Sequence, residues 1–330
     1  MPVLSRAQGR YRRLGRTELM VSEVGFGALA IGGLRWSGVD DERSLAALRR
    51  AFDLGVNFFD TADVYGRGHS EELIGRAFAG RRASVIIATK VGFDFYRGEP
   101  VRSNFRPEYI RTALEKSLSR LGSDYVDIYQ LHNPPQKLAK EAGVWETLAD
   151  LKARGMVRFY GVSARTANDA LAYLRSAEED GEGSRRFGDT LQVAYNLLDQ
   201  EAATKGAFVQ AFRQDWGVIA RVPLASGMLG GKYGAGHEFP PDDFRSDWSR
   251  ERVAETARRV QTLRFLVREP IATLPQAALA FVLSQEAVST VIAGAKTPEQ
   301  VEENAAASDL APLPDEDLRR AQVLYETDFA

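Results

Sequence analysis

The sequence has no cysteine in its 330 residues. Disulfide bonds, thiolate nucleophiles and zinc-thiolate sites are therefore excluded. Histidine is scarce as well, with only His69, His132 and His237. One histidine at a strand end and scattered carboxylates do not make a ligand cluster, so we expect no metal site and give little weight to a metal-dependent barrel hydrolase.

The chain also has no strong excess of charge and no long apolar run. Its formal net charge is -2, which argues against electrostatic attraction to nucleic acid or to an anionic membrane and favours small-molecule partners. No window approaches the roughly 18 apolar residues that a membrane span needs. The first 13 residues are polar and basic without an apolar signal region, so we expect a cytoplasmic protein.

Short apolar runs of β character alternate with segments of helical period along the whole chain. The predicted strands are Val21–Leu29, Asn57–Thr61, Ser84–Lys90, Tyr125–His132, Arg158–Ser163, Thr190–Asn196, Val218–Leu224 and Val288–Ala293. The predicted helices include Asp41–Leu54, Ser70–Ala79, Pro107–Leu121, Val144–Arg154, Asn168–Ala177, Lys205–Asp215 and Leu274–Gln285. Eight such units without a linker predict a single domain, residues 1–330, folded as an α/β (β/α)₈ TIM barrel, with an open doubly wound sheet as the main alternative.

Three further segments fall outside this repeat. Tyr11–Met20 is typical of a hairpin and is predicted to plug the floor of the barrel. Gly227–Arg250 is a long irregular stretch, and such stretches usually form lids or binding loops. The tail from Pro314 onward is predicted to end as a C-terminal helical extension.

Four residues of complementary chemistry lie at predicted strand ends or just beyond them. Asp60, Lys90 and His132 each close an apolar run, and Tyr65 follows Asp60 by five residues. A lone strand-end Asp can also cap a turn, and an isolated Tyr is more often a packing residue. The carboxyl ends of barrel strands form one face, the face where active sites of this fold lie, so the four together predict one catalytic site.

These residue types can assemble a proton donor for carbonyl chemistry. We expect the ammonium of Lys90, held by Asp60, to stabilise the phenolate of Tyr65 and to lower its pKa from about 10. The phenol would then be a usable general acid, and His132 would orient or polarise the substrate carbonyl.

The stretch Asn57-Phe-Phe-Asp-Thr-Ala-Asp-Val-Tyr-Gly, with Ser70-Glu-Glu-Leu-Ile-Gly75, closely resembles the signature of the aldo-keto reductase superfamily. Further matching motifs extend the resemblance over nearly the whole chain: Ile87–Lys90, Asp127–His132, Gly161–Ser163, Gln192–Asn196, Pro223–Gly227 and Val291–Asn304. The resemblance implies a (β/α)₈ barrel, a nicotinamide cofactor bound without a Rossmann fold, and reversible reduction of aldehydes or ketones to alcohols. It assigns the four catalytic roles to Asp60, Tyr65, Lys90 and His132.

The resemblance also implies which residues contact the cofactor. Ser163 and Gln192 match residues that bind the nicotinamide carboxamide, although Ala164 stands where many members have Asn. Arg221 occupies a position at which many relatives stack a tyrosine, and its charge would disfavour the cationic oxidised cofactor. The other implied positions are Gly27, Leu224, Ser226, Gly227 and Lys232, with Gly294, Lys296, Gln300 and Asn304 at the adenosine end.

Other residues that mark NADPH preference in many relatives are replaced in this sequence, but Lys296 is present and can pair with a 2′-phosphate. NADP(H) is therefore the favoured cofactor, with NAD(H) as the alternative. The predicted substrate pocket comprises Trp36, Phe93, Phe95 and Asn133, which suits an apolar carbonyl or a sugar.

Two other functions stay open at this point. Some relatives bind the cofactor and regulate ion channels, so a redox sensor with little turnover is one alternative. An NAD(P)-linked aldose dehydrogenase is another, because close relatives include sugar dehydrogenases. A structural or interaction role without cofactor is the weakest reading.

Overall fold

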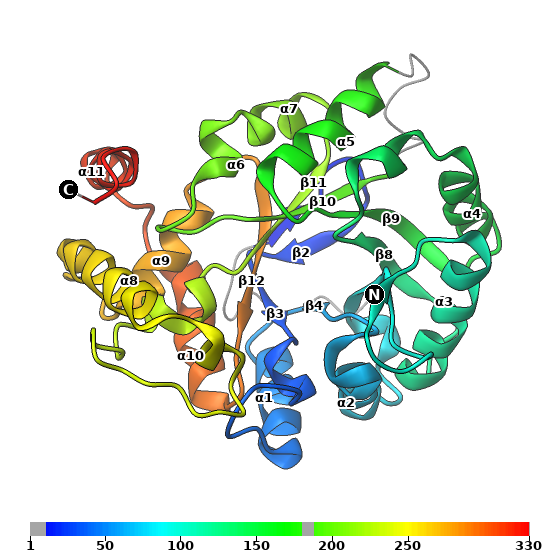
Figure 1. Cartoon of the computed structure of the whole chain (residues 1–330), viewed down its shortest axis with the longest axis horizontal. Coiled ribbons are helices and arrows are strands. Elements are labelled where there is room, and N and C mark those ends of the chain that lie inside the picture. Colours follow the sequence, from blue (N-terminus) through cyan, green and yellow to red (C-terminus); the bar gives the residue numbers. More distant parts are fainter. Residues whose placement is uncertain (1–10, 180–187, 330) are drawn as a thin grey trace.

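A computed structural model describes residues 11–179 and 188–329 of the chain. Eight parallel strands form a closed barrel (Figure 1), in which each strand pairs with the next along the chain and the last pairs with the first. They are β3 (Val24–Gly27), β4 (Phe58–Asp60), β5 (Ile86–Val91), β8 (Val126–His132), β9 (Val157–Ser163), β10 (Thr190–Ala194), β11 (Gly217–Arg221) and β12 (Val288–Gly294). The predicted TIM barrel is confirmed and the open sheet is excluded.

Helices surround the barrel, and their apolar faces cover the outside of the strands. They are α1 (Asp41–Asp53), α2 (His69–Ala77), α3 (Pro107–Leu121), α4 (Ala142–Ala153), α5 (Ala167–Glu179), α6 (Glu201–Thr204), α7 (Ala207–Arg213), α8 (Arg250–Thr262), α9 (Leu274–Leu283), α10 (Pro298–Ala305) and α11 (Asp315–Glu326). Asp40 caps α1, as its type predicts, by accepting a hydrogen bond from the backbone N–H of Arg43 at 2.8 Å.

The prediction of one strand over Val21–Leu29 is wrong at both ends. Val21 and Ser22 belong to β2 (Met20–Ser22), which pairs with β1 (Tyr11–Arg13) as the predicted hairpin, and the barrel strand β3 ends at Gly27. The chain leaves the hairpin at Ser22 because side chains hold its backbone. Asn57 Oδ1 accepts the Ser22 N–H at 2.8 Å, and the Thr290 hydroxyl donates to the Ser22 carbonyl at 2.8 Å.

The hairpin closes the end of the barrel opposite the catalytic strand ends. Its apolar side chains Leu14, Leu19 and Val21 form one buried cluster with residues that point into the barrel, among them Phe58 and Ile128. The barrel interior is thus a packed core at this end. The polar side chains that point into the barrel therefore lie at the other end, where the strands terminate.

Two other segments lie outside the eight units. The stretch after Gly227 runs as a loop beside α8 and α10 (Figure 1), with a short 3₁₀ turn at Phe244–Asp247 before α8 begins. The C-terminal helix α11 is fixed by an ion pair between Arg268 and Asp317 at 2.5 Å and by a hydrogen bond from Gln200 Nε2 to the Ala321 carbonyl at 3.2 Å. None of the helices in the described ranges has both the length and the apolar character for a membrane span.

Candidate active site

The carboxyl ends of three neighbouring strands bring Asp60, Lys90 and His132 together. In the strand register Asp60 of β4 lies opposite Ala88 of β5, and Lys90 lies opposite Gln130 of β8. His132, two residues further along β8, lies opposite Ser163 of β9. Since side chains alternate along a strand, Gln130 and His132 share the face that points into the barrel.

Asp60 and Lys90 form a buried ion pair through Asp60 Oδ1, with side chains 1% and 0% exposed. The Lys90 ammonium also donates to the Thr61 carbonyl at 2.6 Å and lies 3.5 Å from the hydroxyl of Tyr65. Asp60 holds the charge of Lys90 in place, and the Thr61 carbonyl orients it. The structure therefore brings the predicted carboxylate, amine and phenol into one contact chain.

The expected lowering of the Tyr65 pKa below its usual value is wrong for this structure. Burial of the phenol raises its pKa above 10.0, and the charge of Asp60 raises it further. Lys90 and Arg221 act in the opposite direction without cancelling burial. The sequence indicated the neighbouring ammonium correctly but not the depth of the pocket, and burial leaves the phenol a weaker acid than expected.

His132 is held as a neutral imidazole. Burial and the positive charges of Lys90 and Arg221 lower its pKa well below the usual value. Its ring meets the rings of Tyr65 and Phe93 edge-on, with centroids 5.8 and 5.0 Å apart. A neutral imidazole has one N–H, which it can offer to a carbonyl oxygen.

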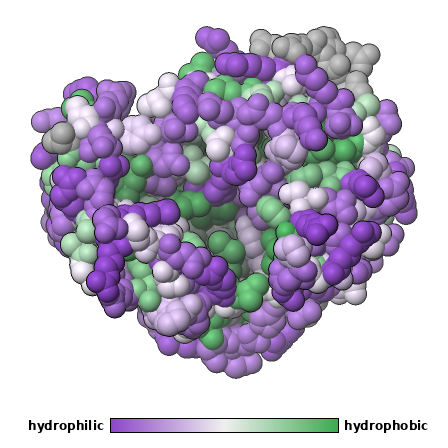
Figure 2. Space-filling view, in the orientation of Figure 1, coloured by the Kyte–Doolittle hydropathy of each residue, from purple (hydrophilic) through white to green (hydrophobic). Residues whose placement is uncertain are grey.

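A cavity of about 510 Å³ opens above these residues. The space-filling view shows this face of the molecule hollowed near its middle, with hydrophobic residues on the walls (Figure 2). All of the expected cofactor positions line it: Gly27, Ser163, Gln192, Arg221, Leu224, Ser226, Gly227, Lys232, Gly294, Lys296, Gln300 and Asn304. Asp60, Tyr65 and His132 line it as well, while Lys90 lies beneath Asp60.

The structure places two of the four expected substrate residues in the cavity wall. Trp36 and Asn133 line the cavity. Phe93 is not among the lining residues, but its ring contacts that of His132, which is. Phe95 departs from the expectation, because its buried ring packs on Tyr96, with centroids 4.1 Å apart.

One end of the cavity is positively charged. Lys232, Lys296 and Arg245 line it together. Burial lowers the pKa of Lys296, and the charges of Lys232 and Arg245 lower it further. The Lys296 ammonium also donates to the Ser37 carbonyl at 2.8 Å. Cations that repel one another in a cavity favour an anionic ligand, so this end fits the phosphates of a dinucleotide.

Arg221 joins this end of the cavity to the catalytic residues. Its Nη2 donates to the carbonyls of Ala164 and Arg165, each at 3.0 Å. Its Nε is buried and has no hydrogen-bond partner within residues 11–179 and 188–329. Arg221 lines the cavity and places a positive charge close enough to Tyr65 to lower the pKa of the phenol.

Two contributions were missed from the sequence. Gln130 donates from its side-chain amide to Asp60 Oδ2 at 3.2 Å; the period-two spacing from His132 was the signal that could have found it. Arg245 is held by Asp243 and donates to the Ser226 carbonyl at 2.9 Å. It lies inside the stretch predicted only as a loop.

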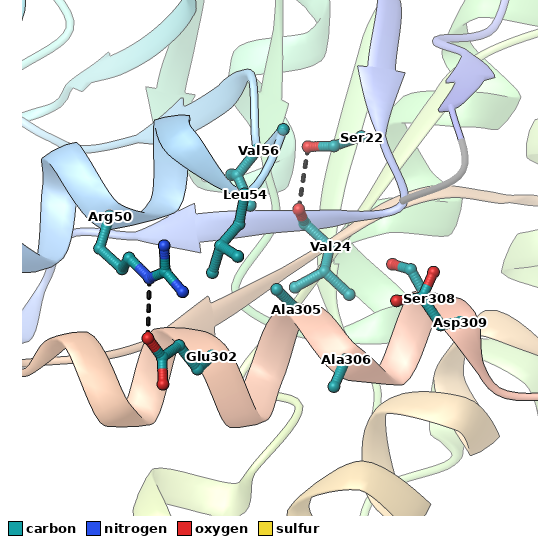
Figure 3. Close-up of a pocket in the computed structure, with 11 residues that line it drawn as sticks. Ser22, Val24, Arg50, Leu54, Val56, Glu302, Ala305, Ala306, Ser308 and Asp309 are labelled. Atoms are coloured by element: carbon teal, nitrogen blue, oxygen red, sulfur yellow. Dashed lines mark hydrogen bonds and ion pairs between the residues drawn. The ribbon is translucent and has the colours of Figure 1, made fainter. Parts of the chain in front are cut away.

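A second hollow of about 240 Å³ lies on the outside of the barrel between α1 and the end of α10 (Figure 3). Its two longest charged side chains, Arg50 and Glu302, pair with each other at 2.7 Å. The rest of its wall includes Val24, Leu54 and Val56.

Comparisons with known proteins show the family of the chain. The family model "Aldo/keto reductase family" matches residues 23–326. The chain is 31% identical over 313 residues to the NADH-specific methylglyoxal reductase of Escherichia coli strain K12, covering 89% of this chain and 92% of the relative. It is also 31% identical over 314 residues to a probable voltage-gated potassium channel subunit beta of Oryza sativa subsp. japonica, covering 92% of each.

Solved structures give the same result. The glycerol dehydrogenase AKR11B4 from Gluconobacter oxydans superposes with a TM-score of 0.80 at 28% identity, covering 97% of this chain and 96% of that one.

The fold and the site together define a (β/α)₈-barrel oxidoreductase that depends on a nicotinamide cofactor. With its matched residues spanning nearly the whole barrel, the chain belongs to the aldo/keto reductase family.

Proposed function

We propose that the protein is an NADP(H)-dependent reductase of aldehydes or ketones in which Tyr65 is the general acid. The observation that carries the proposal is the contact chain from Asp60 through Lys90 to Tyr65, which ends at the cavity wall. The bound cofactor supplies the hydride. The residues of this chain supply the proton and hold the carbonyl.

The roles follow from the environment of each group. Tyr65 carries its proton at neutral pH, because its pKa lies above 10.0, and its O–H lines the cavity where it can donate to the carbonyl oxygen. Once that proton leaves, the Lys90 ammonium stabilises the phenolate. The neutral His132 can donate a second hydrogen bond to the same oxygen and so fix the orientation of the carbonyl.

The residues around the cavity fit the cofactor. Ser163 and Gln192 lie next to each other at its inner end and can pair with a carboxamide, while Arg221 offers a flat cation beside them. Lys232 and Lys296 suit the pyrophosphate and a 2′-phosphate. Lys296, as a partner for the 2′-phosphate, supports NADP(H) over NAD(H), although the methylglyoxal reductase relative is described as NADH-specific.

The substrate class is the point at which the relatives diverge. One is named for methylglyoxal and one for glycerol. The aromatic side of Trp36 and the amide of Asn133 suit either a small apolar carbonyl or a polyol or sugar. Reversibility lets the same site act as an aldose dehydrogenase.

A panel of aldehydes, ketones and sugars assayed with both cofactors tests the proposal. We expect NADPH oxidation with simple aldehydes to exceed NADH oxidation. A redox sensor is the second candidate, supported by the likeness to the potassium channel subunit. A sensor would bind NADPH tightly, which fluorescence titration measures, and would show almost no turnover with any carbonyl.

A further inference from the structure

Asp60 uses both of its carboxylate oxygens, and the two have different partners. Oδ1 faces Lys90. Oδ2 accepts a hydrogen bond from Gln192 Nε2 at 2.7 Å and one from Gln130 Nε2 at 3.2 Å. Gln130 and Gln192 are both buried, so the carboxylate is held in the barrel from three strands besides its own.

The two glutamines stand in different positions relative to the cavity. Gln192 lines it, and its Oε1 accepts a hydrogen bond from Ser163 at 3.1 Å, so a ligand in the cavity can compete for its amide. Gln130 is not among the lining residues. It precedes His132 by two residues on β8 and therefore lies deeper in the barrel. Its hold on Asp60 therefore does not depend on what occupies the cavity.

Gln130 is also an unfavourable choice for packing alone. Its side-chain oxygen Oε1 is buried and finds no hydrogen-bond partner in the described part of the chain. A buried polar atom without a partner reduces stability, so an apolar side chain of the same size would serve a purely structural role better. The useful part of this side chain is the amide N–H that points at Asp60.

We propose that Gln130 is a positioning residue of the proton donor: its amide fixes Oδ2 of Asp60, so that Oδ1 orients Lys90 toward Tyr65. The inference rests on the proposed function, in which Tyr65 donates the proton. Gln130 does not line the cavity, so it acts on the reaction through Asp60.

The charged groups around Asp60 determine how the Gln130 amide affects the acidity of Tyr65. Lys90, Tyr65, His132 and Arg221 are the titratable or charged groups that face it from β5, the loop after β4, β8 and β11. The negative charge of Asp60 makes Tyr65 a weaker acid. An amide N–H at Oδ2 stabilises part of that charge on the side away from Lys90, and its loss leaves Tyr65 weaker still.

The first test replaces Gln130 with methionine, which keeps the length and removes the N–H. We expect kcat/KM for carbonyl reduction to fall about three- to tenfold, the effect of a weaker general acid. Alcohol oxidation at the same pH should fall by the same factor, because the overall equilibrium constant is unchanged. The affinity for NADPH in fluorescence titration should stay within about twofold of the original.

The second test is Gln130→Glu. The new side chain has the same shape as glutamine, but it can donate a hydrogen bond only when its carboxyl group is protonated. At about pH 5.5 the introduced carboxyl, protonated beside Asp60, can donate to Oδ2 and should restore activity above that of Gln130→Met. At about pH 9 it is ionised, repels Asp60, and should lower activity below that of Gln130→Met. Urea unfolding of the protein without cofactor gives the pH at which the new carboxyl ionises, and the crossover in activity should coincide with it.

Thr190→Val is the matched control, since Thr190 is a buried barrel residue whose hydroxyl has no hydrogen-bond partner in the described ranges. It should leave the pH profile unchanged. The inference is overturned if Gln130→Glu and Gln130→Met keep the same activity ratio across the pH range, or if Thr190→Val slows the reaction as much. Tyr65→Phe separates the role of Gln130 from the proposed function. Retained carbonyl reduction in Tyr65→Phe would refute the proposed function, whereas the results for the Gln130 variants bear only on the positioning role.

Discussion

Asp63 offers a prediction about stability that is independent of catalysis. Its side chain is 0% exposed, and no hydrogen bond of normal geometry from the described residues reaches either carboxylate oxygen. Burial and the nearby Glu71 raise its pKa well above the usual value, while Arg120, the backbone N–H of Val64 and Lys90 oppose this only in part. Asp63 is therefore protonated in the folded protein under conditions in which it ionises in the unfolded chain.

The sign of the pH dependence follows from that difference. With the folded pKa above the unfolded one, the folded state binds the extra proton, so the free energy of unfolding falls as pH rises from about 4 toward the folded pKa. Each unit of difference removes about 1.4 kcal/mol. Asp63→Asn cannot ionise and loses nothing over this range. We expect Asp63→Asn to be more stable than the original protein, by more at about pH 8 than at about pH 5.

Urea unfolding at the two pH values measures this difference. The exposed Asp309 is the control, and Asp309→Asn should change the free energy of unfolding by less than about 0.5 kcal/mol at either pH. A stability gain for Asp63→Asn that is equal at both pH values, or a loss that grows with pH, would refute the reasoning.

Three further predictions concern the cavity. Lys90→Met should lower kcat for carbonyl reduction at least about 100-fold while NADPH still binds, since the ammonium stabilises the phenolate rather than the cofactor; fluorescence titration beside steady-state rates checks both. Lys296→Ala should weaken NADPH binding about tenfold and NADH binding by less than about twofold, and equal weakening of both would contradict its pairing with a 2′-phosphate. Arg221→Tyr should strengthen binding of the oxidised cofactor relative to the reduced one, because a positive charge is removed beside the ring; an unchanged ratio of the two dissociation constants contradicts that placement.

The barrel and the catalytic strand ends could be predicted because period and position carry them. Strand-end polar residues such as Asp60 and Lys90 stand out against apolar runs, and the register of a closed parallel barrel brings such ends together. The first strand was misplaced because Ser22 bonds to the side chains of Asn57 and Thr290, which are distant in sequence. No local pattern records such contacts.

The electrostatics of the site needed the structure. The sequence indicates that Lys90 and Tyr65 are near each other, but the pKa of the phenol depends on how much water reaches it, and burial outweighs the ammonium. Gln130 was missed for a related reason. A glutamine within an apolar strand shows its role only when its amide is seen to reach Asp60.

Measuring both the rate of carbonyl reduction and the affinity for NADPH in Tyr65→Phe tests the central claim most directly. The phenyl ring fills the same space, so NADPH should bind with an affinity within about twofold of the original, while carbonyl reduction should fall at least about 100-fold. Reduction at an unchanged kcat in that variant would contradict Tyr65 as the proton donor.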